Sequence, residues 1–134
     1  MNQQQVINKI IESTRCIAVV GFSSKKERAG FYVPAYLQQA GYRIIPVNPN
    51  LEEGLGERAY ANLAAIPEHV DLVLIFQRSE NVPPFVDQAI EMGATAVWMQ
   101  LGIYHEEAAA AAQAAGLDVV MDACMLVEHQ RHQK

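Results

Sequence analysis

Hydrophobic and polar positions occur in alternating blocks along this chain: short apolar runs follow one another with helical patterns between them. The apolar runs predict five strands, at residues 17–20, 42–47, 71–76, 96–99 and 118–121. The segments between them predict helices at residues 6–14, 31–40, 60–65, 83–92 and 104–115, and a closing helical turn or two at 124–130. Residues 51–58 are expected to form a loop.

Strands with a continuous apolar run, such as residues 71–76 after the initial Asp71, are typical of a parallel sheet that is covered on both faces. Right-handed crossovers then predict a doubly wound, Rossmann-like α/β fold, with five parallel strands and helices on both faces. We expect residues 1–134 to form a single domain, in which residues 1–15 are a leading helix and residues 124–134 a C-terminal helical tail.

Composition narrows the class of protein. With 51% hydrophobic and 19% charged residues, the chain has the composition of a globular domain. Its net charge of −5 disfavours a nucleic-acid partner, and no apolar run approaches the ~20 residues of a membrane span. Two cysteines without metal-type spacing, and the absence of a secretory signal, favour the reducing cytoplasm.

The first predicted strand ends at a glycine and opens into a polar loop with hydroxyl and cationic side chains. Glycine lets a backbone come close to a ligand, and the following helix N-terminus adds positive potential and free N–H groups. The loop therefore predicts a site for a phosphate-bearing, nucleotide-like ligand. Its candidate residues are Gly21, Phe22, Ser23, Ser24, Lys25, Lys26 and Arg28.

Two common nucleotide motifs are incomplete in this chain. The dinucleotide fingerprint G-x-G-x-x-G has one glycine here instead of three, and the second strand ends in Asn48-Pro49 rather than a carboxylate. No G-K-[ST] follows the glycine either, so a P-loop is not indicated. Ordinary NAD binding is accordingly disfavoured, and an NAD(P)-responsive regulator stays open only as an alternative.

Four segments, at residues 17–28, 41–49, 97–102 and 120–124, resemble the family of CoA-binding proteins. These are small single-domain relatives of the N-terminal CoA-binding domain of the succinyl-CoA synthetase α subunit. The resemblance extends over residues 17–128 and implies CoA as the bound cofactor. It assigns phosphate contacts to Gly21, Ser23, Ser24 and Arg28, where charge-assisted hydrogen bonds are strongest.

The same resemblance implies positions for the rest of CoA. Asn48 and Pro49 would border the adenosine, Phe76 and Arg78 would flank the nucleotide, and Gln100 to Gly102 would line the path of the pantetheine arm.

The chain departs from the family pattern at three positions. Gln77 replaces a common arginine, Gly30 replaces a helix-capping serine or asparagine, and Ala123 replaces an arginine before Cys124.

The expected function is binding of CoA or acyl-CoA, with no catalytic motif evident. Alternatively, the chain supplies the CoA site to a partner chain of an acyl-CoA ligase or transferase.

The four histidines lack metal spacing or triad partners. Cys124 is either a structural thiol or a group that forms a mixed disulfide with CoA, and Trp98 is expected in the core.

Overall fold

Five parallel strands form the central sheet of the computed structural model, which describes residues 1–134. Their order across the sheet is β2-β1-β5-β6-β7. The chain thus adds β2 on one side of β1 and the later strands on the other side, which makes the position between β1 and β5 the topological switch point. The strands are β1 (Cys16–Val20), β2 (Arg43–Val47), β5 (Leu72–Ile75), β6 (Ala96–Met99) and β7 (Asp118–Val120). This arrangement confirms the predicted Rossmann-like doubly wound sheet.

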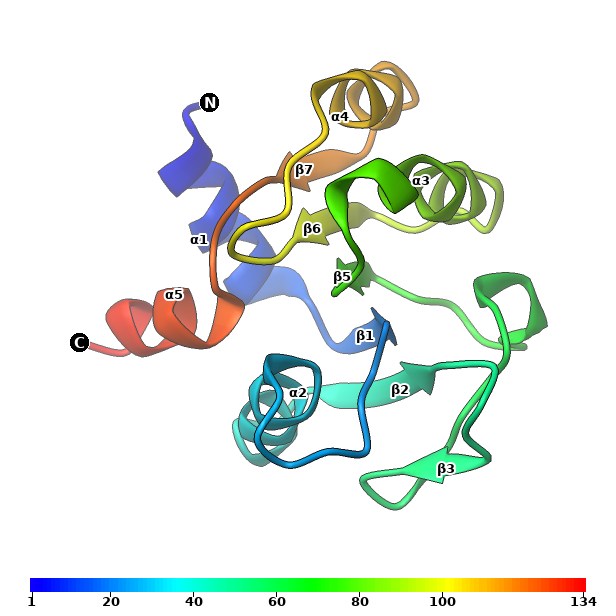
Figure 1. The fold of residues 1–134 in the computed structure, drawn as a ribbon. Coiled ribbons are helices and arrows are strands. Elements are labelled where there is room, and N and C mark those ends of the chain that lie inside the picture. The colour runs from blue at the N-terminus through cyan, green and yellow to red at the C-terminus, as the bar shows by residue number, and fades with distance from the viewer.

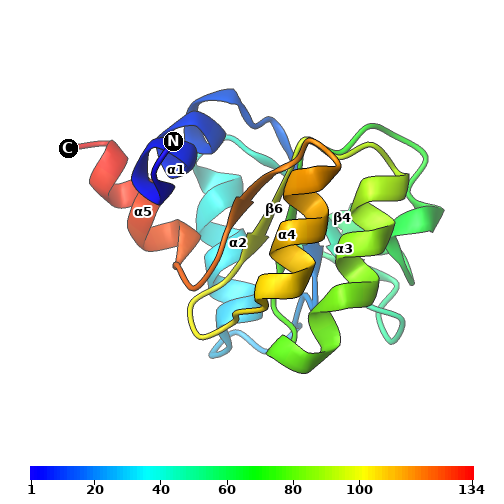
Figure 2. The same ribbon diagram turned by 90° about the horizontal axis from the view of Figure 1, so that it is seen from above.

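Helices cover both faces of the sheet (Figure 1). Helices α3 (Val82–Glu91) and α4 (Glu106–Ala114) pack on one face together with the 3₁₀ turn η1 (Leu63–Ala65). Helices α1 (Gln3–Ser13), α2 (Ala29–Gln39) and α5 (Met125–His132) pack on the other face. Figure 2 shows α1 and α5 side by side, so that both chain termini lie at the same end of the molecule. A second 3₁₀ turn, η2 (Ser79–Asn81), precedes α3.

The uninterrupted apolar strands are explained by this double coverage, because successive side chains of a strand point to opposite faces. In β1, Ala18 and Val20 join the core beneath α3 and α4, whereas Ile17 and Val19 join the core beneath α1, α2 and α5. Trp98 of β6 is fully buried, as predicted, and its indole N–H donates to the Ala123 carbonyl at 2.8 Å.

Helix α1 begins at Gln3, three residues before the predicted start. A reciprocal capping box explains the difference: Asn2 Oδ1 accepts from Gln5 N–H, and Gln5 Oε1 accepts from Asn2 N–H, both at 2.9 Å. Polar capping residues extend a helix beyond its apolar stripe, so hydrophobic periodicity alone misses this turn.

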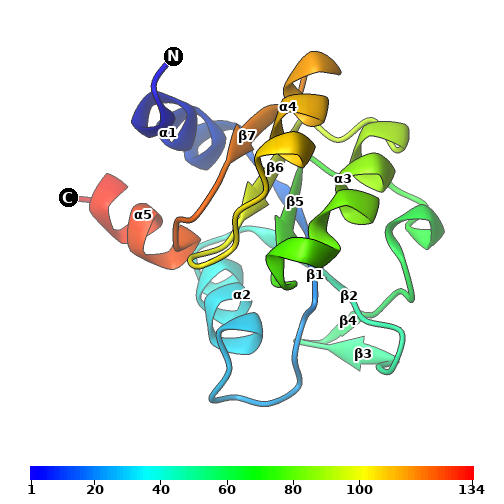
Figure 3. The same cartoon turned by 45° about the horizontal axis from the view of Figure 1, so that its top comes forward.

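Residues 51–58, predicted as a loop, contain a two-residue antiparallel pair, β3 (Glu53–Gly54) with β4 (Glu57–Arg58). Strands this short carry no alternation that a sequence reading could detect. The pair packs on the loop after β1: a Cβ added at Gly54 would come within 2.3 Å of the Phe22 ring. Figure 3 shows β3 and β4 set apart from the main sheet, below β2.

Helix α5 is held to α2 by a buried histidine. His129 is 8% exposed, its Nδ1 lies 2.7 Å from the Tyr36 hydroxyl, and its ring forms T-shaped pairs with the rings of Tyr36 and Tyr42. Burial, with a smaller contribution from His132, lowers the pKa of His129 below its ordinary value. The folded protein therefore favours the neutral imidazole.

We predict that the contribution of His129 to the free energy of unfolding is fully present above pH ~6.5, the ordinary histidine pKa, and is lost as the pH drops towards the lowered pKa of folded His129. The reason is that the unfolded chain binds the proton more readily than the folded one. Urea unfolding across this range measures the effect, and His129→Gln should flatten the dependence. An equally steep dependence in His129→Gln would contradict the assignment.

Candidate functional site

The loops after β1 and β5 meet at the point where the strand order reverses, which is where ligands bind in open α/β sheets. Gly21 directly follows β1 and has a positive φ of 83°, and a Cβ added there would lie 2.5 Å from the Phe76 carbonyl oxygen. Gly30 lies at a second point of close packing, because a Cβ added there would lie 2.8 Å from the carbonyl oxygen of Gly21. Both glycines allow the loop, α2 and the end of β5 to pack together.

The expected cap at Gly30 is wrong: α2 starts at Ala29, Arg28 is the N-cap residue, and Gly30 lies in the first turn. The close approach to Gly21, rather than capping, accounts for the glycine.

A cavity of about 950 Å³ opens above this point, at the upper end of the range for small-molecule sites. Loops after β1, β2, β5 and β6 line it. Among the predicted residues, only Lys26 and Pro49 lie outside the lining. Those that line it are Gly21, Phe22, Ser23, Ser24, Lys25, Arg28, Asn48, Phe76, Arg78, Gln100 and Gly102.

Leu101 also lines the cavity, within the predicted path over residues 100–102. Six further lining residues were not predicted to contact the ligand, although each lies within two positions of a residue that was. They are Ala29, Gly30, Asn50, Leu51, Gln77 and Ile103.

The cavity carries positive charge although the chain as a whole is acidic. Lys25, Arg28 and Arg78 line it, no aspartate or glutamate does, and none of the three cations forms an ion pair with a carboxylate of the protein. Because screening limits electrostatic effects to roughly 8–10 Å, these local charges outweigh the distant carboxylates. The charge of the lining therefore suits an anion.

The N-terminus of α2 adds to this potential. Arg28 makes no side-chain cap, and the backbone N–H groups of Ala29 and Gly30 have no acceptor in the protein. All three residues line the cavity. Uncapped N–H groups and the helix dipole together form an anion-binding position.

Asn48 holds two of the loops together rather than leaving its amide free. Its Nδ2 donates to the Phe22 carbonyl at 2.8 Å, and its Oδ1 accepts from Asn50 N–H at 2.8 Å. Asn48 thus ties the end of β2 to the glycine loop. Ser23 is also engaged, because its hydroxyl accepts from Lys25 N–H at 3.1 Å.

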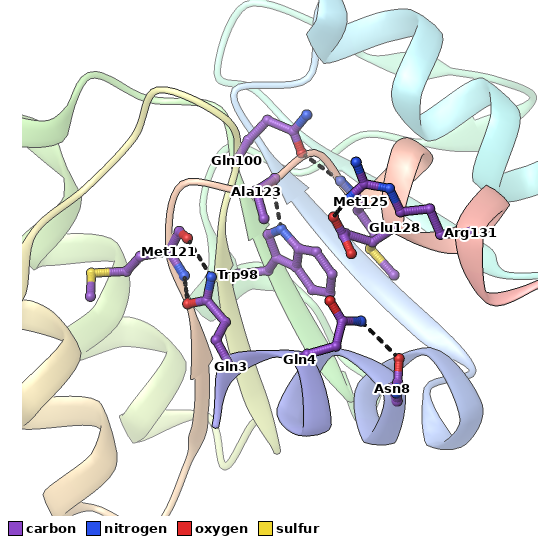
Figure 4. A network of polar contacts seen from close by, with 10 residues as sticks. All are labelled: Gln3, Gln4, Asn8, Trp98, Gln100, Met121, Ala123, Met125, Glu128 and Arg131. Atoms are coloured by element: carbon purple, nitrogen blue, oxygen red, sulfur yellow. Dashed lines mark hydrogen bonds and ion pairs between the residues drawn. The ribbon is translucent and has the colours of Figure 1, made fainter. Parts of the chain in front are cut away.

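Gln100 is buried, with 4% exposed, and connects the cavity to α5. Its Oε1 accepts from Met125 N–H at 3.3 Å and so caps α5 from outside the helix, as Figure 4 shows. Its Nε2 has no hydrogen-bond partner in the protein. The adjoining loop is fixed by Gly102, whose N–H donates to Asp122 Oδ1 at 2.7 Å.

The two cysteines lie in different environments. Cys16 is buried in β1, and burial raises the pKa of its thiol to about 11. Cys124 is partly exposed and lines a second, smaller cavity of about 450 Å³. Only Cys124 is therefore placed to meet a ligand or a reagent.

Fold and cavity together define a Rossmann-like α/β domain with a positively charged cavity at its topological switch point. Within that class, residues 15–130 match the family described as CoA binding domain, and the chain belongs to this family. None of its helices is long and apolar enough to cross a lipid bilayer.

Relatives of two kinds are similar to this chain. The uncharacterized protein YneT of Bacillus subtilis (strain 168) is 39% identical over 123 residues, which span 92% of this chain and 91% of that protein. The ADP-forming acetate–CoA ligase II of Archaeoglobus fulgidus is 31% identical over 81 residues, 59% of this chain but 12% of the ligase.

Solved structures agree with the fold. A hypothetical protein from Pyrococcus horikoshii OT3 superposes with a TM-score of 0.94 and 38% identity, covering 99% of this chain and 94% of that one. The region is therefore found both as a chain of this size and as a small part of ADP-forming ligases.

Gly21→Ala should destabilise the protein more than a matched substitution at Gly93. Both glycines have positive φ, but an added Cβ meets nothing within 4 Å at Gly93. We expect Gly93→Ala to cost about 1–2 kcal/mol and Gly21→Ala to cost about 1–3 kcal/mol more. Denaturant unfolding of both variants measures this, and equal costs would contradict the close-approach argument.

In the folded protein, a thiol-alkylating reagent should modify Cys124 and spare Cys16, because Cys16 is buried with a raised pKa. Peptide mapping after a short exposure identifies the labelled residue, and labelling in denaturant provides the control. Comparable labelling of both thiols without denaturant would refute this placement.

Proposed function

We propose that this protein binds CoA or acyl-CoA in the larger cavity. The observation that carries the proposal is the set of Lys25, Arg28 and Arg78, which lack carboxylate partners, beside the uncapped N-terminus of α2. A ligand with several phosphate groups would supply the missing negative charge and hydrogen-bond acceptors. Membership of the CoA binding domain family supports CoA as that ligand.

In this proposal the CoA phosphates lie on the glycine loop and the start of α2. Ser24, Arg28 and the N–H groups of Ala29 and Gly30 contact them, and Gly21 lets the glycine loop pack against the end of β5 beside them. The adenosine lies towards Asn48 and Phe76, with Arg78 beside it. Asn48 shapes this part of the site through its bonds to the loops.

The pantetheine arm then runs over residues 100–102. It carries two amide groups, and the partnerless Nε2 of Gln100 would donate to one of their carbonyls. The loop that supports the arm is held in place by the hydrogen bond from Gly102 to Asp122.

A second candidate function is favoured by the ligase relatives. The matched region makes up 12% of the A. fulgidus ligase, so this chain would supply only the CoA site to a partner chain. This candidate predicts a stoichiometric complex and acyl transfer only when the partner is present. Copurification from the native cell extract followed by a transfer assay distinguishes it from a free CoA-binding protein.

Isothermal titration with CoA should give a one-site isotherm with micromolar affinity, about −8 kcal/mol. NAD⁺ and ATP, titrated in parallel, should bind more weakly because neither matches the whole site. Clear binding of NAD⁺ with no heat from CoA would overturn the proposal and favour a dinucleotide regulator.

Arg28→Ala should weaken CoA binding by about tenfold or more, because charge-assisted hydrogen bonds to phosphate are lost. Lys26→Ala is the matched control: it removes one positive charge from the same loop, but Lys26 does not line the cavity. We expect the control to change affinity by less than about threefold. Equal losses in both variants would mean that the loop acts only through its net charge.

A further inference from the structure

We infer that the smaller cavity receives the acyl group of a short hydroxyacyl-CoA, with Glu128 accepting a hydrogen bond from the acyl hydroxyl. The inference rests on the proposed CoA site and adds the class of acyl group. The cavity of about 450 Å³ lies between the start of α1, the segment after β7 and α5.

The two cavities are neighbours and share one residue, Leu101. Leu101 follows β6 and is 66% exposed, so it stands at the surface where the two cavities meet. A ligand arm that leaves the larger cavity along residues 100–102 therefore reaches the smaller one at Leu101. Only the end of CoA distal to its phosphates, the thiol and any acyl group on it, would arrive there.

Glu128 is the unusual feature of this cavity. It is 8% exposed, and its Oε2 accepts from Arg131 Nη1 at 3.0 Å, as Figure 4 shows. Its Oε1 is buried and has no hydrogen-bond partner. A buried carboxylate oxygen without a donor is costly, and a donor supplied by a ligand would remove that cost.

The other lining groups narrow the class of acyl group. Ile7, Leu101 and Val127 offer apolar contacts to a short carbon chain. Asp122 and Glu128 give two negative charges against the single positive charge of Arg131, which Glu128 already pairs. This balance disfavours an acyl group that ends in a carboxylate, whereas an uncharged hydroxyl can donate to Glu128 Oε1.

The test compares the affinities of CoA, butyryl-CoA, 3-hydroxybutyryl-CoA and succinyl-CoA by calorimetry. We expect 3-hydroxybutyryl-CoA to bind at least about fivefold more tightly than butyryl-CoA, as a hydrogen bond to a charged group predicts. Succinyl-CoA should bind more weakly than either. In Glu128→Leu, which has neither an acceptor nor a donor on its side chain, the preference for the hydroxyl should fall to within about twofold, while CoA affinity stays unchanged.

Val127→Trp is a second, independent variant, since Val127 is partly exposed and does not line the larger cavity. The larger side chain should fill the smaller cavity, weaken both four-carbon acyl-CoAs at least about fivefold and leave CoA unaffected. If CoA binds normally but the acyl-CoAs show no hydroxyl preference, or if succinyl-CoA binds best, the acyl site is wrong and the CoA site stands. If CoA itself fails to bind, the proposed function fails, and this inference fails with it.

Discussion

The close packing of Gly21 against the end of β5 is the constraint on which the site depends. A side chain at Gly21 would collide with the Phe76 carbonyl, and one at Gly30 would collide with Gly21 itself. Because both positions lack a side chain, α2 can start directly beside the ends of the two central strands. The residues that carry the free N–H groups of its first turn then line the same cavity as the three cations.

Hydrogen bonds between loops turn this packing into a defined surface. Asn48 joins the end of β2 to the glycine loop, and Gln100 joins the end of β6 to α5. Gln3 binds the backbone of Met121 through both atoms of its amide, which fixes α1 against the segment after β7 (Figure 4). The segments after β6 and β7 are thus held by α5 and α1, two helices from opposite ends of the chain that cover the same face of the sheet.

The sequence predicts the fold well because its apolar strands are long enough to be recognised and each, apart from β2, is followed by an α-helix. The helix predicted after β2, at residues 60–65, is only the 3₁₀ turn η1. The glycine loop, with its hydroxyl and cationic side chains, predicts six of the 18 residues that line the cavity, and the family resemblance adds those predicted in the other three loops. Other features depend on contacts between distant residues. The roles of Asn48 and Gln100 as loop ties, the fit of Gly30 beside Gly21 and the partnerless Glu128 oxygen all arise from packing that no local pattern encodes.

The central claim is that CoA phosphates bind at the N-terminus of α2, and amide NMR during a CoA titration tests it most directly. The account predicts that the largest shifts occur at the backbone N–H groups of Ser24, Ala29 and Gly30, with smaller shifts at residues 100–102. CoA binding accompanied by shifts at a different part of the protein, with Ala29 and Gly30 unchanged, would contradict the account.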